Sequence, residues 1–252
     1  MSLTVPTDLS PQENGSMASI GTAAWSSVGK KVINALTGML LMGFIVVHLI
    51  GNLTLLFNDP GPFNDYAHFL MTAMHGWLIY IFEVGLLAIA AFHIVTAVTV
   101  AWMDKRAARA VGYKYGRDAK GTSRKTLASK TMIYSGAIIL VYVVAHIYLF
   151  KFGNHELDSK GLPNLYKTVV TTFKDPVFTI FTVVSMTLLG FHLRHGFWSS
   201  FQSLGWANDR YLPGLIKVAW VFAFVMALGF IVIPVLAMVW LDPAAVRHLG
   251  GH

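Results

Sequence analysis

His48, His93, His146 and His192 lie one each in four separate hydrophobic stretches of the chain. An ionisable side chain is costly inside hydrocarbon, so such a residue within a membrane-length segment usually marks a functional site. Neutral imidazole is also the commonest metal ligand among side chains. One such histidine has an ordinary explanation, an imidazole bonded to a neighbouring carbonyl, but four in matching positions favour a shared role. The pattern predicts metal-binding chemistry inside a membrane domain.

The composition is that of an integral membrane protein. Of the 252 residues, 55% are hydrophobic and 12% are charged, whereas a soluble domain carries about a quarter charged residues. The formal net charge is +7, but the cations flank apolar segments, which favours membrane lipid over nucleic acid as the partner. The chain has no cysteine, which excludes disulfides, iron–sulfur ligation by this chain and thioether-attached haem.

Five stretches are long enough to cross a bilayer, because about 20 apolar residues span the hydrocarbon as a helix. They predict an all-α integral membrane fold in which residues 25–241 form one domain. We expect membrane helices over residues 30–57, 75–103, 130–150, 176–201 and 215–241.

The segment between the second and third predicted helices indicates the orientation. Residues 104–130 hold nine lysines and arginines against two aspartates, and short loops rich in such cations stay on the cytoplasmic side. We therefore expect residues 1–24 to form a polar cytoplasmic tail and residues 242–252 a short tail on the outer side.

Depth along the helices sorts the four histidines into two layers. At about 1.5 Å per residue, His48 and His146 lie about 24 to 25 Å from the inner ends of their helices, and the other two lie at about 14 to 15 Å. Pairing within a layer gives an outer pair, His48 with His146, and an inner pair, His93 with His192. Two ligands suit haem, whose macrocycle supplies four more, better than zinc, which takes three or four protein ligands. We expect four of the helices to form a bundle around two stacked haems about 10 Å apart.

The two halves of this bundle are similar in sequence. The interval from His48 to His93 is 45 residues, and that from His146 to His192 is 46 residues. This supports two hairpins that pack face to face, with the fifth helix added outside. Six glycines near the histidines are expected to leave room for a flat macrocycle: Gly43, Gly51, Gly85, Gly136, Gly190 and Gly196.

Two stretches, together with the order of the four histidines, resemble a known family. They are KVINALTGML (31–40) continuing to HLIGNL (48–53), and GFHLRHGFWSSFQSLG (190–205). Over about residues 25–241 the chain resembles the dihaem cytochrome b membrane anchor of succinate:quinone oxidoreductase, which is also called succinate dehydrogenase or fumarate reductase. It resembles the single-polypeptide, five-helix type. Some relatives carry a glutamate two residues before the fourth histidine, where this chain has Gly190.

The resemblance implies a subunit of a respiratory enzyme in the bacterial cytoplasmic membrane. Succinate would be oxidised on a flavoprotein subunit that carries FAD, and an iron–sulfur subunit docked on the cytoplasmic face would deliver the electrons. This chain would pass them through two haem b groups to a quinone, usually menaquinone. In this family the second and fourth helices hold the inner haem and the first and third hold the outer one, the same pairing as depth predicts.

Other polar residues are candidates for contacts with the haem edges and the quinone. Glu83 lies about 15 Å outward of His93, which suits proton delivery to quinone or a protonated carboxyl bonded to a neighbouring helix. Quinone reduction needs a proton donor, for which the first outer loop offers candidates beside the simpler role of a solvated loop. The cations have lipid headgroups as their simpler partners. The full set is Glu83, Asp65, His68 and His75 for quinone or protons, and Lys30, Lys31, Lys130 and Arg194 for haem propionates.

Two other functions fit the same spans. Cytochrome b anchors of quinone-linked hydrogenases or formate dehydrogenases also hold bis-histidine haems, though with different histidine spacing, and co-purification with a flavoprotein separates them. A haem-free transporter that uses the histidines and Glu83 as a proton relay is the alternative from another class. An optical spectrum separates that one.

Overall fold

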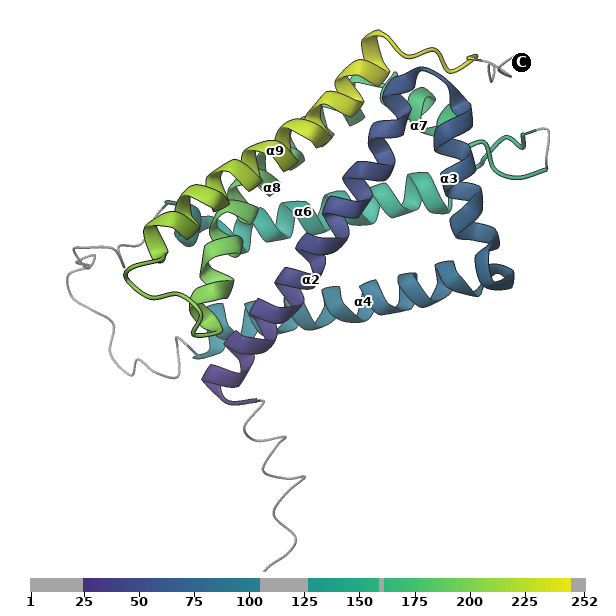
Figure 1. Ribbon diagram of the computed structural model, residues 1–252. Helices are drawn as coiled ribbons and strands as arrows, with labels where there is room; N and C mark the ends of the chain where they lie inside the picture. Colours follow the sequence, from purple (N-terminus) through teal and green to yellow (C-terminus); the bar gives the residue numbers. More distant parts are fainter. Residues whose placement is uncertain (1–24, 105–126, 159–160, 246–252) are drawn as a thin grey trace, which may run out of the picture.

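The structure is a computed structural model that describes residues 25–104, 127–158 and 161–245. In these ranges the chain is helical apart from turns and one isolated bridge between Leu157 and Pro163. The expected tails, 1–24 and most of 242–252, and most of the basic segment 104–130 lie outside them, so the orientation stays a prediction. The long helices (Figure 1) are α2 (Ser27–Leu53), α4 (Trp77–Val98), α6 (Leu127–Lys151), α8 (Pro176–Ser203) and α9 (Leu212–Val239).

Five helical segments are long and apolar enough to cross a membrane. This confirms the prediction of an all-α chain with five such helices and indicates a multi-pass membrane protein. The bounds differ from the predicted ones by a few residues. For example, α2 begins at Ser27 because the Ser26 hydroxyl oxygen accepts a hydrogen bond from the Gly29 N–H at 3.0 Å, an ordinary helix cap. Helix α4 continues at its C-terminal end as a π-helical turn, η3 (Thr99–Asp104).

Two short helices were not predicted, α3 (Pro60–Thr72) and α7 (Leu165–Phe173). The expectation of a loop after the first membrane helix was therefore wrong for residues 60–72. The Asp59 carboxylate caps α3 by accepting from the Gly61 N–H at 2.7 Å, and Pro60 occupies the first helical position, where its fixed φ is favourable. The Asn164 side chain caps α7 by accepting from the Lys167 N–H at 3.1 Å. Short 3-10 turns, η1 (Thr54–Phe57) and η2 (Ala73–Gly76), connect α3 to its neighbours.

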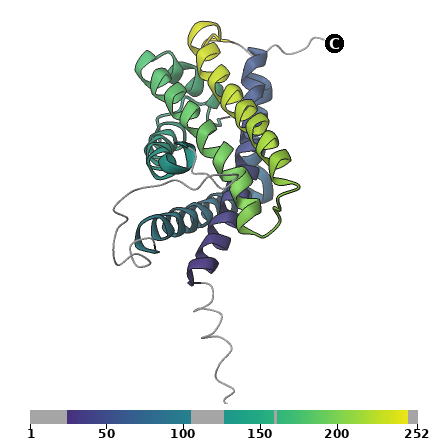
Figure 2. The ribbon, with the colours of Figure 1, turned by 90° about the vertical axis from the view of Figure 1, so that its left-hand side faces the viewer.

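The long helices pack in a defined order. Helix α2 packs against α4 and α8, α6 packs against α8, and α9 packs mainly against α8. Glycine allows α8 and α9 to approach closely, because a Cβ at Gly190 would lie 2.9 Å from the Cβ of Ala227 on α9. Among the described residues, α4 and α6 do not pack closely on each other. Figure 2 shows α9 and α4 on opposite sides of the molecule.

The buried core lies toward the end of the molecule that carries α3 and α7 (Figure 1). There the side chains of Leu55, Tyr166 and Val170 are fully buried. Helix α4, by contrast, buries only Thr96 among its described residues. Its many exposed apolar side chains suit contact with lipid or with a large apolar group, because hydrocarbon tolerates them and water does not.

Candidate functional site

The structure places His48 of α2 beside His146 of α6. Their ring centroids are 5.9 Å apart and their planes make an angle of 84°. Phe44 stacks on His48 with a centroid distance of 5.4 Å, and Phe150 lies 4.8 Å from His146. The outer pair therefore stands among aromatic side chains, with no charged group among these ring neighbours.

The structure also places His93 of α4 beside His192 of α8, with ring centroids 6.5 Å apart and planes at 66°. The Nδ1 atom of His93 lies 3.2 Å from the backbone oxygen of Asn34 and 3.3 Å from Oγ1 of Thr37. The Nδ1 atom of His192 lies 3.1 Å from Oγ of Ser135. Because the δ nitrogens of this inner pair face oxygen atoms, the ε nitrogens are the ones available to a metal.

Both pairs join helices that face each other across the bundle. Helices α2 and α6 do not pack closely in the described part of the chain, and neither do α4 and α8. The histidines thus approach one another from helices that are otherwise held apart. These are the same two pairs that depth along the sequence predicts.

The spacing of the pairs fits a metal bound between two imidazoles. A metal–imidazole bond of about 2.0 to 2.1 Å, with the nitrogen about 1.1 Å from the ring centre, separates two opposed ring centres by about 6.2 to 6.4 Å. The observed centroid distances are 5.9 and 6.5 Å. Within the described ranges, no group of three or more His, Cys, Asp or Glu side chains could hold a metal. A metal at either pair would need its other ligands from a non-protein group, and a haem macrocycle supplies four of them.

Glycines beside the histidines have two different roles. A Cβ at Gly38 would lie 3.1 Å from Cε1 of His93, and one at Gly136 would lie 3.4 Å from Cε1 of His192. These two glycines therefore make room for the inner imidazoles. The expectation that all six named glycines adjoin a macrocycle was too broad, because Gly51 adjoins Tyr66 and Gly190 adjoins α9. Nothing lies within 4 Å of a Cβ built at any of the remaining three: Gly43, Gly85 and Gly196.

The cations named for haem propionates differ in their surroundings. The Arg194 guanidinium lies over the Trp220 ring, 3.9 Å from its centroid, a favourable cation–π geometry. Its Nε atom is buried and has no hydrogen-bond partner. Lys30 is buried and Lys31 is exposed at the start of α2, while the side chain of Lys130 lies outside the described part. Arg194 is therefore a half-buried cation with a buried N–H donor that has no protein partner.

Glu83 of α4 forms an ion pair with Lys151, the last residue of α6. Both side chains are partly exposed, at 32% and 41%. Glu83 is therefore bonded to a neighbouring helix, α6, and its partner there is a cation. Lys151 was not among the predicted site residues, although its position directly after a predicted helix was a usable signal.

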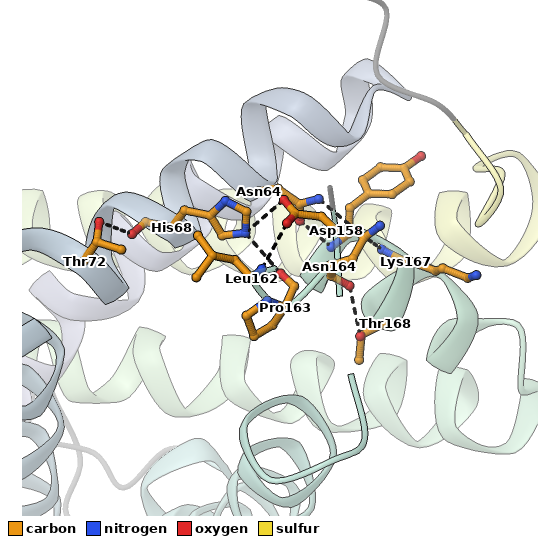
Figure 3. A network of polar contacts seen from close by, with 10 residues as sticks. Asn64, His68, Thr72, Asp158, Leu162, Pro163, Asn164, Lys167 and Thr168 are labelled. Atoms are coloured by element: carbon orange, nitrogen blue, oxygen red, sulfur yellow. Dashed lines mark hydrogen bonds and ion pairs between the residues drawn. The ribbon is translucent and has the colours of Figure 1, made fainter. Parts of the chain in front are cut away.

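His68 belongs to a buried polar network at the end that carries α3 and α7 (Figure 3). Its Nε2 atom lies 3.2 Å from the Pro163 carbonyl oxygen and 3.7 Å from a carboxylate oxygen of Asp158. In the same network, the Asn64 amide donates to Asn164 at 3.0 Å and accepts from the backbone N–H of residue 166 at 2.9 Å. Asn64 thus fastens α3 to the start of α7, and His68 fastens α3 to the segment that precedes α7.

The other outer candidates, Asp65 and His75, are less buried than His68. Asp65 is half-buried on α3, and His75 is exposed in η2 with a positive φ of 57°. The pKa of Tyr166, whose backbone N–H bonds Asn64, is raised. The main cause is burial of the phenol, and the carboxylates of Asp242 and then Asp59 add to it.

Comparison with protein-family models, curated proteins and solved structures finds no match to this chain. Assignment of a function therefore depends on the two histidine pairs and on the residues that surround them.

Proposed function

We propose that this chain is a dihaem cytochrome b that anchors a succinate:quinone oxidoreductase in the membrane and carries its electrons to a quinone. The proposal is carried by the two histidine pairs, whose ring-centroid distances of 5.9 and 6.5 Å suit an iron atom between the two rings of each pair. Each pair lies between helices that do not pack on each other, as a wide planar group requires. The stretches at 31–53 and 190–205 add the resemblance to the family.

In this proposal the residues of the chain hold the groups and shield them. His48 with His146, and His93 with His192, would provide the axial nitrogens for two haem b groups, which supply reversible one-electron transfer. Phe44 and Phe150 would keep water from the outer imidazoles. Arg194, with a buried unpartnered Nε atom, would donate to a propionate of the inner haem, and Lys30, Lys31 and Lys130 are the other candidates.

The partner subunits and the quinone follow from the resemblance. A flavoprotein with FAD would oxidise succinate, and an iron–sulfur subunit would dock at the cytoplasmic face near the basic segment 104–130. The quinone, usually menaquinone, would accept electrons near the outer pair. The Glu83–Lys151 ion pair is the charged group on the long helices best placed to deliver its protons, ahead of Asp65, His68 and His75 around α3.

The first test is an optical spectrum of the purified chain, reduced with dithionite and compared with the oxidised form, with a pyridine haemochrome count. We expect two b-type haems per chain. A well-folded preparation without haem would overturn the proposal and favour a proton-coupled transporter. Co-purification with a flavoprotein and succinate-dependent haem reduction are expected for this enzyme, whereas a hydrogenase or formate dehydrogenase partner would redirect the assignment.

A further inference from the structure

We propose that α2 and α6 each carry a hydroxyl–glycine step, Thr37-Gly38 and Ser135-Gly136, that positions the inner-pair histidine of the adjacent helix. This inference rests on the proposed haem function and adds residues that it does not contain. In each step the hydroxyl fixes the imidazole tautomer and rotation, and the glycine provides the space in which the ring stands.

The hydroxyl of Ser135 is oriented by its own helix. It donates to the Met132 carbonyl at 3.0 Å, so a lone pair of its oxygen is left to accept from Nδ1–H of His192 at 3.1 Å. Ser135 is buried, with 6% of its surface exposed, so water does not compete for this bond. His192 is thereby held with its proton on Nδ1 and with Nε2 free to bind a metal.

Thr37 is arranged in the same way on α2. Its hydroxyl donates to the Ile33 carbonyl at 2.7 Å, and its oxygen lies 3.3 Å from Nδ1 of His93. The Asn34 carbonyl, at 3.2 Å, is a second acceptor for the same imidazole N–H. His93 therefore has two acceptors where His192 has one, and we expect Ser135 to matter more than Thr37.

The glycine that follows each hydroxyl residue has a steric role. A Cβ at Gly38 would lie 3.1 Å from Cε1 of His93, and one at Gly136 would lie 3.4 Å from Cε1 of His192. The distance at Gly38 is short for a Cβ contact, so a side chain there would push the His93 imidazole away from its hydroxyl partner. At Gly136 a Cβ would just touch the His192 ring, so only a side chain larger than that of alanine would displace it. The two-residue step therefore combines an acceptor with a space of matching size.

The same two helices also carry the outer histidines, and the spacing is equal. Thr37 precedes His48 by 11 residues, and Ser135 precedes His146 by 11 residues. Eleven residues are about three helical turns, which puts both members of each set on one helix face. Each of α2 and α6 therefore presents, on the same side, a histidine of the outer pair and a hydroxyl that bonds a histidine of the inner pair. Within the described residues the outer pair has no equivalent support, because Nδ1 of His146 is buried without a partner.

The test is Ser135→Ala in the purified chain with its haems bound. The loss of the acceptor that the described residues provide for Nδ1–H of His192 weakens the imidazole as a donor to ferric iron. We expect a higher midpoint potential and a changed low-spin EPR signal for the inner haem, with the outer haem unchanged. Ser135→Thr, which keeps the hydroxyl, should restore both properties, and Thr37→Val should give the same changes to a smaller extent. Selective loss of the inner haem from Ser135→Ala would also support the inference.

The matched control is Ser199→Ala on α8. The Ser199 hydroxyl bonds the Gly196 carbonyl three residues earlier at 3.2 Å, as Ser135 bonds that of Met132, but it makes no hydrogen bond to a histidine in the described structure. Two haems in the wild-type chain with an unchanged inner haem in Ser135→Ala would overturn this inference alone. Equal disturbance of both haems would also count against it. A wild-type chain without haem would overturn both this inference and the proposed function.

Discussion

Lys151, the last residue of α6, is ion-paired with Glu83 near the start of α4, although these two helices do not otherwise pack closely in the described structure. At about 1.5 Å per residue, Glu83 lies about 15 Å beyond His93, and Lys151 about 7 Å beyond His146. The ion pair therefore lies on the far side of the outer histidines from the inner pair. A quinone that enters between α4 and α6 would meet a carboxylate and an ammonium group next to the outer haem.

Glu83→Gln tests this position. Loss of a group that transfers protons typically lowers a rate by about 100-fold or more, so we expect quinone reduction by the assembled enzyme to fall by about that factor. Reduction of the haems by succinate should remain. The control is Glu156→Gln, which breaks another exposed ion pair, with Lys167 at 2.6 Å, and should have no effect. Unchanged quinone reduction in Glu83→Gln would exclude a proton-transfer role.

Removal of single histidines should remove single haems. We expect His93→Ala and His192→Ala to lose the inner haem, and His48→Ala and His146→Ala the outer one, as measured by haem counts and reduced-minus-oxidised spectra. His195→Ala, one turn after His192, should keep both haems, because its ring lies against Trp198 at 5.0 Å rather than in a pair. Retention of both haems in a variant of a paired histidine would refute the role of that residue.

The angles between imidazole planes predict the EPR spectrum. Near-perpendicular axial planes leave two iron orbitals almost equal in energy, which gives a strongly anisotropic low-spin signal. The planes make 84° in the outer pair and 66° in the inner pair. We expect two such signals, with the larger maximum g value from the outer haem, assigned with the single-histidine variants. Two signals typical of parallel imidazoles would contradict these orientations.

Gly190 is a packing residue, so the addition of a side chain there should destabilise the protein. Gly190→Ala would bring a Cβ to 2.9 Å from that of Ala227, and overpacking of this kind costs about 1 to 3 kcal/mol. Gly190→Glu, which introduces the carboxylate of some relatives, should be worse because this position faces α9. Thermal unfolding in detergent measures both, with Gly214→Ala, which has open space beside it, as the control. A Gly190→Glu protein as stable as wild type would contradict this prediction and show that α9 can shift away from α8 at little cost in stability.

Asn64 should contribute to stability through the network of Figure 3. Asn64→Ala would leave the buried backbone N–H of residue 166 without its acceptor, at a cost of about 1 to 3 kcal/mol. We expect a lower unfolding temperature with haem spectra unchanged. Asn154→Ala, at an exposed position in the loop after α6, should unfold like wild type. Equal unfolding temperatures for Asn64→Ala and wild type would mean that water replaces the lost acceptor.

The membrane helices and the histidine pairs could be predicted because both depend on simple periodic quantities. Hydrophobic length located the five spans, and rise per residue placed His48 level with His146. Helices α3 and α7 could not be found by length, since they are short, although Asp59-Pro60 and Asn164 are recognisable caps. Thr37 and Ser135 could not be identified as histidine partners, because hydroxyls in helices usually bond their own backbone, as these two also do. Only tertiary packing shows the second bond.

The equal spacing on α2 and α6 restricts which length changes the chain tolerates. One residue inserted between Thr37 and His48 would rotate one against the other by about 100°, so an inner support and an outer ligand could no longer point to the same side. The same holds between Ser135 and His146. Insertions and deletions should therefore be absent from these two eleven-residue intervals, while loops between helices vary freely. A functional homologue with a different interval in either helix would need a new partner for its inner histidine.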